Sequence, residues 1–97
     1  MKRYIVVFSD DAIAEFAASL RWGYENWGEE AAWRWYADVR SSIRKILSTF
    51  PFSQPIAPDN DEYEIEVRQM LVGRYRALFT VQRKRVTILH LRGPFVT

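Results

Sequence analysis

Hydrophobic and polar positions follow patterns that divide the chain into a strand, two helices and a run of strands. Residues 2–8 are mostly β-branched or aromatic and predict a strand. Ser9 and two aspartates follow, which suit the cap and first turn of a helix. Hydrophobic residues then recur every three or four positions, as one helix face requires: Ile13, Phe16, Ala17, Leu20, Tyr24 and Trp27.

A second helix is expected between Gly28 and Pro51. Acidic residues open it and basic residues lie near its end, as the helix dipole favours. Its hydrophobic residues again have helical spacing: Ala32, Trp33, Tyr36, Val39, Ile43, Ile46, Leu47 and Phe50. The sequence therefore predicts a helical hairpin.

The second half of the chain carries the period of strands. Prolines and an Asp-Asn-Asp sequence place a loop at 51–61. Glutamate and hydrophobic residues then alternate at 62–68, which predicts a half-buried strand with Tyr63, Ile65 and Val67 facing inward.

Two further strands are expected on either side of a basic turn at 83–84. The first covers 74–82 and follows a turn at Gly73. The second covers 86–92, and we expect its two core residues to be Leu89 and Leu91. In the strand at 74–82, one face is expected to hold Tyr75, Ala77, Phe79 and Val81.

The predicted order is β-α-α-β-β-β, an α+β fold. A helical hairpin and a strand meander are expected to pack as two layers, with the helices on one face of a small, mostly antiparallel sheet. The 97 residues are the size of one domain, covering 1–97. Six residues are expected in its core: Phe16, Leu20, Val39, Ile43, Ile65 and Phe79.

The composition argues against several kinds of site and location. The chain has no cysteine and one histidine, so we expect no disulfide, no metal and no cofactor. No hydrophobic run approaches the roughly 20 residues that span a bilayer. The run at the N-terminus is too short for a signal peptide. We therefore expect a cytoplasmic protein that does not enter a membrane.

Charge is distributed unevenly along the second half. All charges between Asp59 and Glu66 are acidic, and those from Arg68 onward are basic. The basic residues are Arg68, Arg74, Arg76, Arg83, Lys84, Arg85 and Arg92. This basic block suits an anionic partner, either nucleic acid or an acidic protein segment. The alternative is a solvated surface whose arginines neutralise the neighbouring acidic strand.

Strand alternation predicts which polar residues share the sheet face away from the helices. Ile88 is expected on that face, together with Glu64, Glu66, Arg68, Arg76, His90 and Arg92. A carboxylate and a histidine can act as general base and acid, and arginine can stabilise a phosphorane-like transition state. The alternative is a set of cross-strand ion pairs that catalyses nothing.

Three segments resemble the RelE/ParE toxins of bacterial toxin–antitoxin pairs. The sequence at 73–81, GRYRALFTV, resembles their G-x-Y-R-h-h-h-x-V strand. The segments at 63–68, YEIEVR, and at 88–93, ILHLRG, resemble the strands before and after it. The predicted element order and the length match as well.

The resemblance implies a toxin of one of two kinds. RelE-like members cleave mRNA on the ribosome, whereas ParE-like members poison DNA gyrase. By resemblance Arg76 lies where the nucleases keep a catalytic arginine, and a nuclease here would use it with Glu64, Glu66, His90 and Arg92. RelE itself carries lysines where this chain has the two glutamates, and no tyrosine or histidine follows Arg92. These departures favour a ParE-like toxin, with the basic block binding its target.

The resemblance also implies partners. We expect a type II, plasmid-stabilisation toxin that forms a hetero-oligomer with a cognate antitoxin and meets operator DNA only through it. The antitoxin's disordered tail is expected to wrap the helical hairpin and a sheet edge. Four residues are expected to bind it: Trp22, Trp27, Trp33 and Trp35. An interaction module without toxicity is the remaining hypothesis.

Overall fold

The computed structural model describes residues 3–93 and has the predicted order of elements. Within these residues the strands are β1 (Ile5–Phe8), β2 (Arg68–Val72), β3 (Tyr75–Gln82) and β4 (Arg85–Arg92), and the helices are α1 (Asp10–Trp27) and α2 (Glu29–Leu47). The strands form one sheet in the order β1-β4-β3-β2. Strand β1 is parallel to β4, and the other neighbours are antiparallel.

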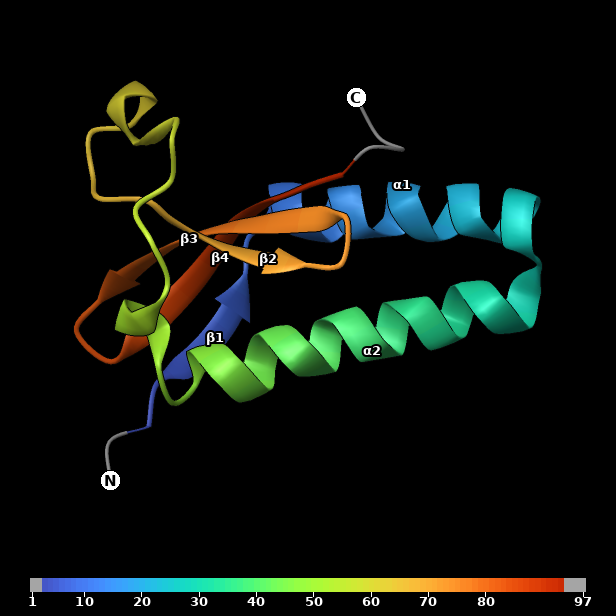
Figure 1. Cartoon of the computed structure of the whole chain (residues 1–97), viewed down its shortest axis with the longest axis horizontal. Coiled ribbons are helices and arrows are strands. Elements are labelled where there is room, and N and C mark those ends of the chain that lie inside the picture. Colours follow the sequence, from blue (N-terminus) through green and yellow to red (C-terminus); the bar gives the residue numbers. More distant parts are fainter. Residues whose placement is uncertain (1–2, 94–97) are drawn as a thin grey trace.

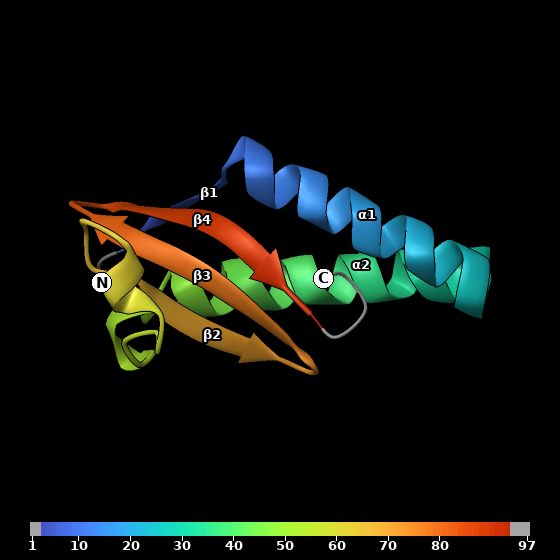
Figure 2. The ribbon, with the colours of Figure 1, turned by 90° about the horizontal axis from the view of Figure 1, so that it is seen from above.

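The two helices form a hairpin that covers one face of the sheet (Figure 1). Gly28 joins them with a φ of 97°, a value that glycine adopts without a side-chain clash. Figure 2 shows that the tip of this hairpin extends well beyond the sheet. Within residues 3–93, neither helix is long and apolar enough to cross a membrane.

A main core fills the space between the helices and the sheet. Four of the six predicted core residues are buried there: Phe16, Val39, Ile43 and Phe79. Leu20 is only half-buried. Ile65 is 42% exposed, so its prediction as a core residue is wrong.

The buried face of α1 is not the face that the large hydrophobic residues indicated. Ile13, Tyr24 and Trp27 are exposed. The residues that face inward are Ala12, Phe16, Ser19 and Gly23. Three of these are small, so α2 approaches closely; a Cβ at Gly23 would lie 3.4 Å from the Cβ of Ala32. Close helix packing, rather than side-chain hydropathy, decides which face is buried.

The strand predicted at 62–68 is wrong. Residues 60–62 form a short 3₁₀ turn, and β2 begins only at Arg68. The backbone N–H of Val67 donates to the side chain of Asn60 at 2.7 Å, and its carbonyl accepts from Ala57 at 2.9 Å. These loop contacts use the polar groups that a strand would offer to its neighbour.

The loop at 51–67 covers part of the sheet face opposite the helices. A second hydrophobic cluster lies beneath it, formed by Ala57, Val67 and Leu78 with Tyr63 and Leu89 beside them. Tyr63 and Val67 thus point inward as predicted, but toward this second cluster. The face that was expected to be open is therefore only partly open.

A β-bulge changes which residues of β4 face the helices. Leu78 pairs with His90 but Phe79 pairs with Ile88, so Leu89 is the extra residue. Ile88 consequently faces the main core together with Leu91. The prediction of Leu91 as a core residue is confirmed, whereas Leu89 lies beside the second cluster and Ile88 is not on the far face.

Candidate functional site

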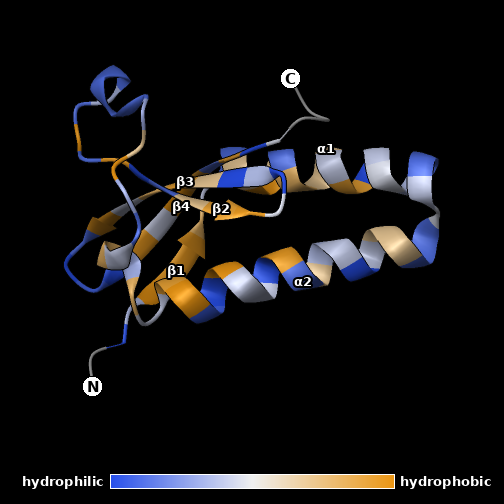
Figure 3. Ribbon diagram, in the orientation of Figure 1, coloured by the Kyte–Doolittle hydropathy of each residue, from blue (hydrophilic) through white to orange (hydrophobic). Residues whose placement is uncertain are grey.

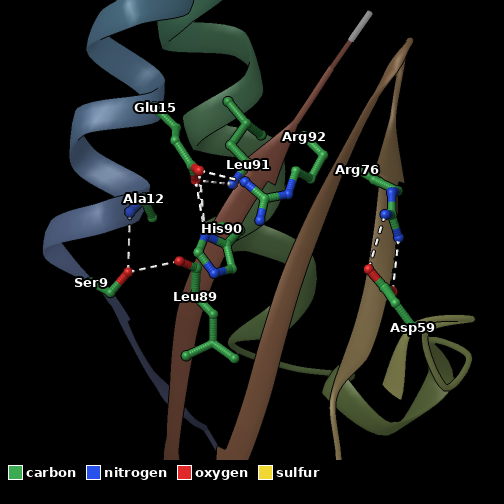
Figure 4. Close-up of polar contacts among 9 residues, drawn as sticks. All are labelled: Ser9, Ala12, Glu15, Asp59, Arg76, Leu89, His90, Leu91 and Arg92. Carbon is green, nitrogen blue, oxygen red and sulfur yellow. Dashed lines mark hydrogen bonds and ion pairs between the residues drawn. The ribbon is translucent and has the colours of Figure 1, made fainter. Parts of the chain in front are cut away.

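Charged side chains gather at the end of β4, as the sequence indicated (Figure 4). Arg76 of β3 and Arg92 of β4 are partners across the two strands, so they lie on the same sheet face. His90 pairs with the neighbouring Leu78 and shares this face. The structure therefore brings together three of the six polar residues predicted there.

Arg76 is held by Asp59 from the loop. Its two terminal nitrogens donate to the two carboxylate oxygens, each at 3.1 Å, and one also donates to Gln69 at 3.0 Å. The hydrogen bonds from Arg76 lower the pKa of Asp59, and Asp59 in turn raises the pKa of Arg76. This bidentate pair neutralises the arginine that the family resemblance singles out.

Glu15 of α1 holds the end of β4, and the sequence analysis missed it. Its carboxylate accepts a hydrogen bond from the backbone N–H of Leu91 at 2.9 Å and pairs with Arg92. The Nδ1 atom of His90 lies 3.3 Å from both carboxylate oxygens. In the sequence, Glu15 is one acid on the polar side of a helix, some 75 residues from these partners, so nothing local identified it.

The topology explains why a helix supplies these contacts. Strand β1 pairs with β4 only as far as Ile88, so no strand of residues 3–93 lies beside this edge of β4 beyond that point. There the Ser9 hydroxyl donates to the carbonyl of Leu89 at 2.9 Å and accepts from the N–H of Ala12 at 3.1 Å. Ser9 and Glu15 thus take the place of a neighbouring strand, and Ser9 also caps α1 as predicted.

The glutamates proposed for catalysis lie elsewhere. Glu64 and Glu66 are exposed residues of the loop rather than of a strand, so their predicted place on the sheet face is wrong. Glu66 pairs with Arg68 at 3.1 Å. Within residues 3–93, no group of three or more His, Cys, Asp or Glu is arranged to hold a metal ion.

Among the solved structures similar to this chain are two of nearly the same extent. A chain of the chromosomal ParDE TA system from P. aeruginosa is 20% identical, with a TM-score of 0.77 over 94% of this chain and 96% of that one. A chain of the toxin–antitoxin complex RelBE2 from Mycobacterium tuberculosis is also 20% identical, with a TM-score of 0.68 over 96% and 93%. The sequence matches no protein-family model and no curated protein.

This chain has the RelE/ParE toxin fold. Helical hairpin, sheet and element order agree with the resemblance read from the strand motifs. The GxYR motif lies at the turn into β3 and along it, with Tyr75 in the main core and Arg76 on the opposite face.

The basic block of this RelE/ParE-like chain is divided between the two ends of the sheet. Arg74 and Arg92 lie at one end, and the β3–β4 turn at 83–85 lies at the other. Strands of eight residues separate them, roughly 25 Å at the usual rise of a strand. Arg68 is fixed against the loop, with its guanidinium over the ring of Phe52 and a 2.7 Å hydrogen bond to the carbonyl of Gln54. The predicted target-binding residues therefore do not form one surface.

The four tryptophans of the hairpin lie in different surroundings. Trp35 packs against the main core, with its ring centroid 5.1 Å from that of Tyr75 and 6.3 Å from that of Phe16. Trp22 and Trp27 contact each other at the hairpin tip, at 5.3 Å. Trp33 is 49% exposed on α2. Two of the four, Trp27 and Trp33, present large exposed surfaces.

Trp33 lies in a groove of about 850 Å³ between α2 and the edge strand β1. Four cationic residues and no carboxylate line this groove: Arg3, Arg40, Arg44 and Lys45. Arg44 lies over the ring of Phe8 and donates to the outward-facing carbonyl of Val6 at 3.3 Å. No local sequence pattern indicated this second cationic surface, because its residues come from α2 and from the segment at β1, which are far apart in the sequence.

Proposed function

We propose that this protein is the toxin of a type II toxin–antitoxin pair and that a cognate antitoxin neutralises it. Both similar structures come from such systems, a ParDE TA system and a RelBE2 toxin–antitoxin complex. The GxYR motif in β3 supports the same assignment. At 20% identity the similarity carries the fold, so the activity rests on the residues of this chain.

We infer that the toxin acts by binding its target, DNA gyrase, and does not cut RNA. The Arg76–Asp59 ion pair is the observation that supports the absence of RNA cleavage, and gyrase is the target that the resemblance to ParE-like toxins implies. A guanidinium already held by a bidentate carboxylate does not offer its charge to a phosphate without breaking both hydrogen bonds. Asp59 and Glu15 also lower the positive potential that an RNA backbone requires at this end of the sheet.

Ribosome-dependent RNA cleavage remains the second candidate because of one contact. His90 lies beside the Glu15 carboxylate, with Arg92 on the same carboxylate. A carboxylate-oriented histidine is a common general acid or base. In this candidate Glu15 replaces Glu64 and Glu66 as the carboxylate of the site.

The groove between α2 and β1 is the surface that best suits the antitoxin. Its cationic lining favours an acidic segment, and the exposed ring of Trp33 offers the kind of aromatic anchor that dominates many interfaces. Trp27 flanks a smaller groove of about 410 Å³ on the β2 side of the hairpin. An antitoxin tail that wraps the hairpin would contact both.

Inducible expression in bacteria tests the target. We expect growth arrest, cleaved gyrase–DNA complexes and a DNA-damage response, with no cuts in primer extension on cellular mRNA. Arg34, an exposed arginine paired with Glu30 on α2, gives the control variant Arg34→Ala. Codon-aligned mRNA cuts that persist in Arg34→Ala and vanish in His90→Ala would refute gyrase binding and favour the nuclease.

Co-purification with the product of the adjacent reading frame tests the antitoxin. We expect Trp33→Ala to weaken this complex while the thermal unfolding temperature of the free toxin stays close to that of the wild type. Phe50→Ala is the matched aromatic control, because Phe50 is 63% exposed and lines neither of the two grooves. Equal affinity in the wild type and Trp33→Ala would place the antitoxin on another surface.

A further inference from the structure

The turn between β3 and β4 carries three consecutive exposed cations, Arg83, Lys84 and Arg85. It forms the end of the β3–β4 hairpin, beside the start of β1 and far from the tip of the helical hairpin (Figure 1). Figure 3 shows a hydrophilic turn between two strands that are largely hydrophobic. The positive charge here belongs to neither the Arg76 site nor the groove beside α2.

These three cations differ from Arg68, Arg76 and Arg92 of the basic block in having no carboxylate partner among residues 3–93. Arg68, Arg76 and Arg92 each form an ion pair, with Glu66, Asp59 and Glu15 respectively. Among residues 3–93, no ion pair involves the three cations of the turn. Their charge is therefore directed to solvent or to a partner.

The backbone conformation at Arg83 indicates that an arginine at this position lowers the stability of the turn. Arg83 has a φ of 59°, in the left-handed region that disfavours residues with a Cβ. The other hairpin turn, between β2 and β3, needs the same φ of 59° and uses Gly73 there. Among residues 3–93, Arg83 is the one residue other than glycine with a positive φ. Strained backbone that is retained in this way commonly marks a functional position.

The surroundings suit phosphate better than a protein segment. A hollow of about 570 Å³ beside the turn is lined by the three cations, Gln82 and Ile5, and by no carboxylate of the described part of the chain. It offers a single hydrophobic side chain, whereas protein interfaces depend on several packed hydrophobic anchors. Exposed arginine and lysine side chains are groups that contact a nucleic-acid backbone.

We propose that the β3–β4 turn binds the phosphate backbone of a nucleic acid without reading its base sequence. The proposal goes beyond the toxin function and does not depend on it. A toxin that acts on a DNA-bound enzyme would reach the DNA itself through this turn. Three phosphate contacts are the most that the three side chains make at one docking position.

Fluorescence anisotropy with the purified chain and a short labelled DNA duplex tests the proposal. Three phosphate contacts predict that log K falls with log salt with a slope of about −2.7 between about 50 and 200 mM salt. The double variant Arg83→Gly/Lys84→Gln is expected to lose about 1.8 units of this slope and more than about tenfold in affinity at the lower salt concentration. The matched control is Arg21→Gln/Arg34→Gln, which removes the same charge from exposed helix positions.

The glycine variant separates binding from folding. Arg83→Gly removes the charge but relieves the positive φ, so its thermal unfolding temperature is expected to equal or exceed that of the wild type. Equal salt slopes for the turn variant and the control would overturn the proposal. So would a polyglutamate peptide that binds the turn more tightly than either duplex DNA or single-stranded RNA. The binding assay uses no cells, so it can fail while toxicity and antitoxin binding are retained, and the reverse.

Discussion

Replacement of Glu15 by alanine is expected to destabilise the fold through the end of β4. The backbone N–H of Leu91, a residue that is 2% exposed, would lose its acceptor, and an unsatisfied buried donor costs about 1–3 kcal/mol. The ion pair with Arg92 adds about 0–1 kcal/mol, because the arginine is 44% exposed. We therefore expect a loss of about 1–4 kcal/mol, a large share of the roughly 5–15 kcal/mol that stabilises a domain.

Urea denaturation at neutral pH measures this loss. Glu25→Ala is the matched control, since Glu25 is an exposed residue of the same helix and the change in helix propensity is identical. It should alter the free energy of unfolding by less than about 0.5 kcal/mol. Glu15→Gln keeps an oxygen acceptor for Leu91 and should lose only about 1 kcal/mol. A Glu15→Ala variant as stable as the Glu25→Ala control would refute the view that α1 closes the edge of β4.

Three other changes test the loop, the hairpin and the sheet end. Arg76 lowers the pKa of Asp59, so this pair stabilises the fold near neutral pH, and the contribution is lost as the pH falls through the folded-state pKa of Asp59. Asp59→Asn should therefore reduce the free energy of unfolding at neutral pH and make it decline less steeply in acid. Urea titrations across that pH range would show both effects. Trp35→Ala should cost about 3–5 kcal/mol, because its ring packs on the main core, and an unchanged unfolding temperature would contradict this. Gly93→Ala should cost about 1–3 kcal/mol, because the new Cβ overlaps the buried ring of Tyr75; calorimetry that detects no loss would show that the chain end shifts freely.

The hairpin and the last two strands could be predicted from the sequence because their signals are local. Helical spacing, Gly28 and the Gly73 turn each act within a few residues. The prediction of a strand at 62–68 was wrong because an alternating pattern indicates which side chains are buried. It does not indicate which groups form hydrogen bonds with the backbone. In this loop Val67 is buried and Tyr63 is half-buried, but the backbone of Val67 bonds to the Asn60 side chain and to Ala57.

The site could be predicted only for the residues that lie on neighbouring strands. Arg76, His90 and Arg92 were found together because strand alternation fixes their face, despite the bulge at Leu89. Glu15 and Asp59, which neutralise the two arginines, come from a helix and a loop. Their position depends on tertiary packing, and no pattern in a single sequence encodes it.

The place of β4 between β1 and β3 has a consequence for how the protein is made. Strand β1 is synthesised first, but it pairs only with β4, some 80 residues later in the chain. In a nascent chain that has emerged only as far as β3, β1 therefore has no strand with which to pair. Long-range pairing of this kind slows folding, because the loop must close before the contact forms. The sheet is therefore completed late, when β4 inserts, and a chain interrupted before β4 has neither a joined sheet nor the Arg92 end of the site.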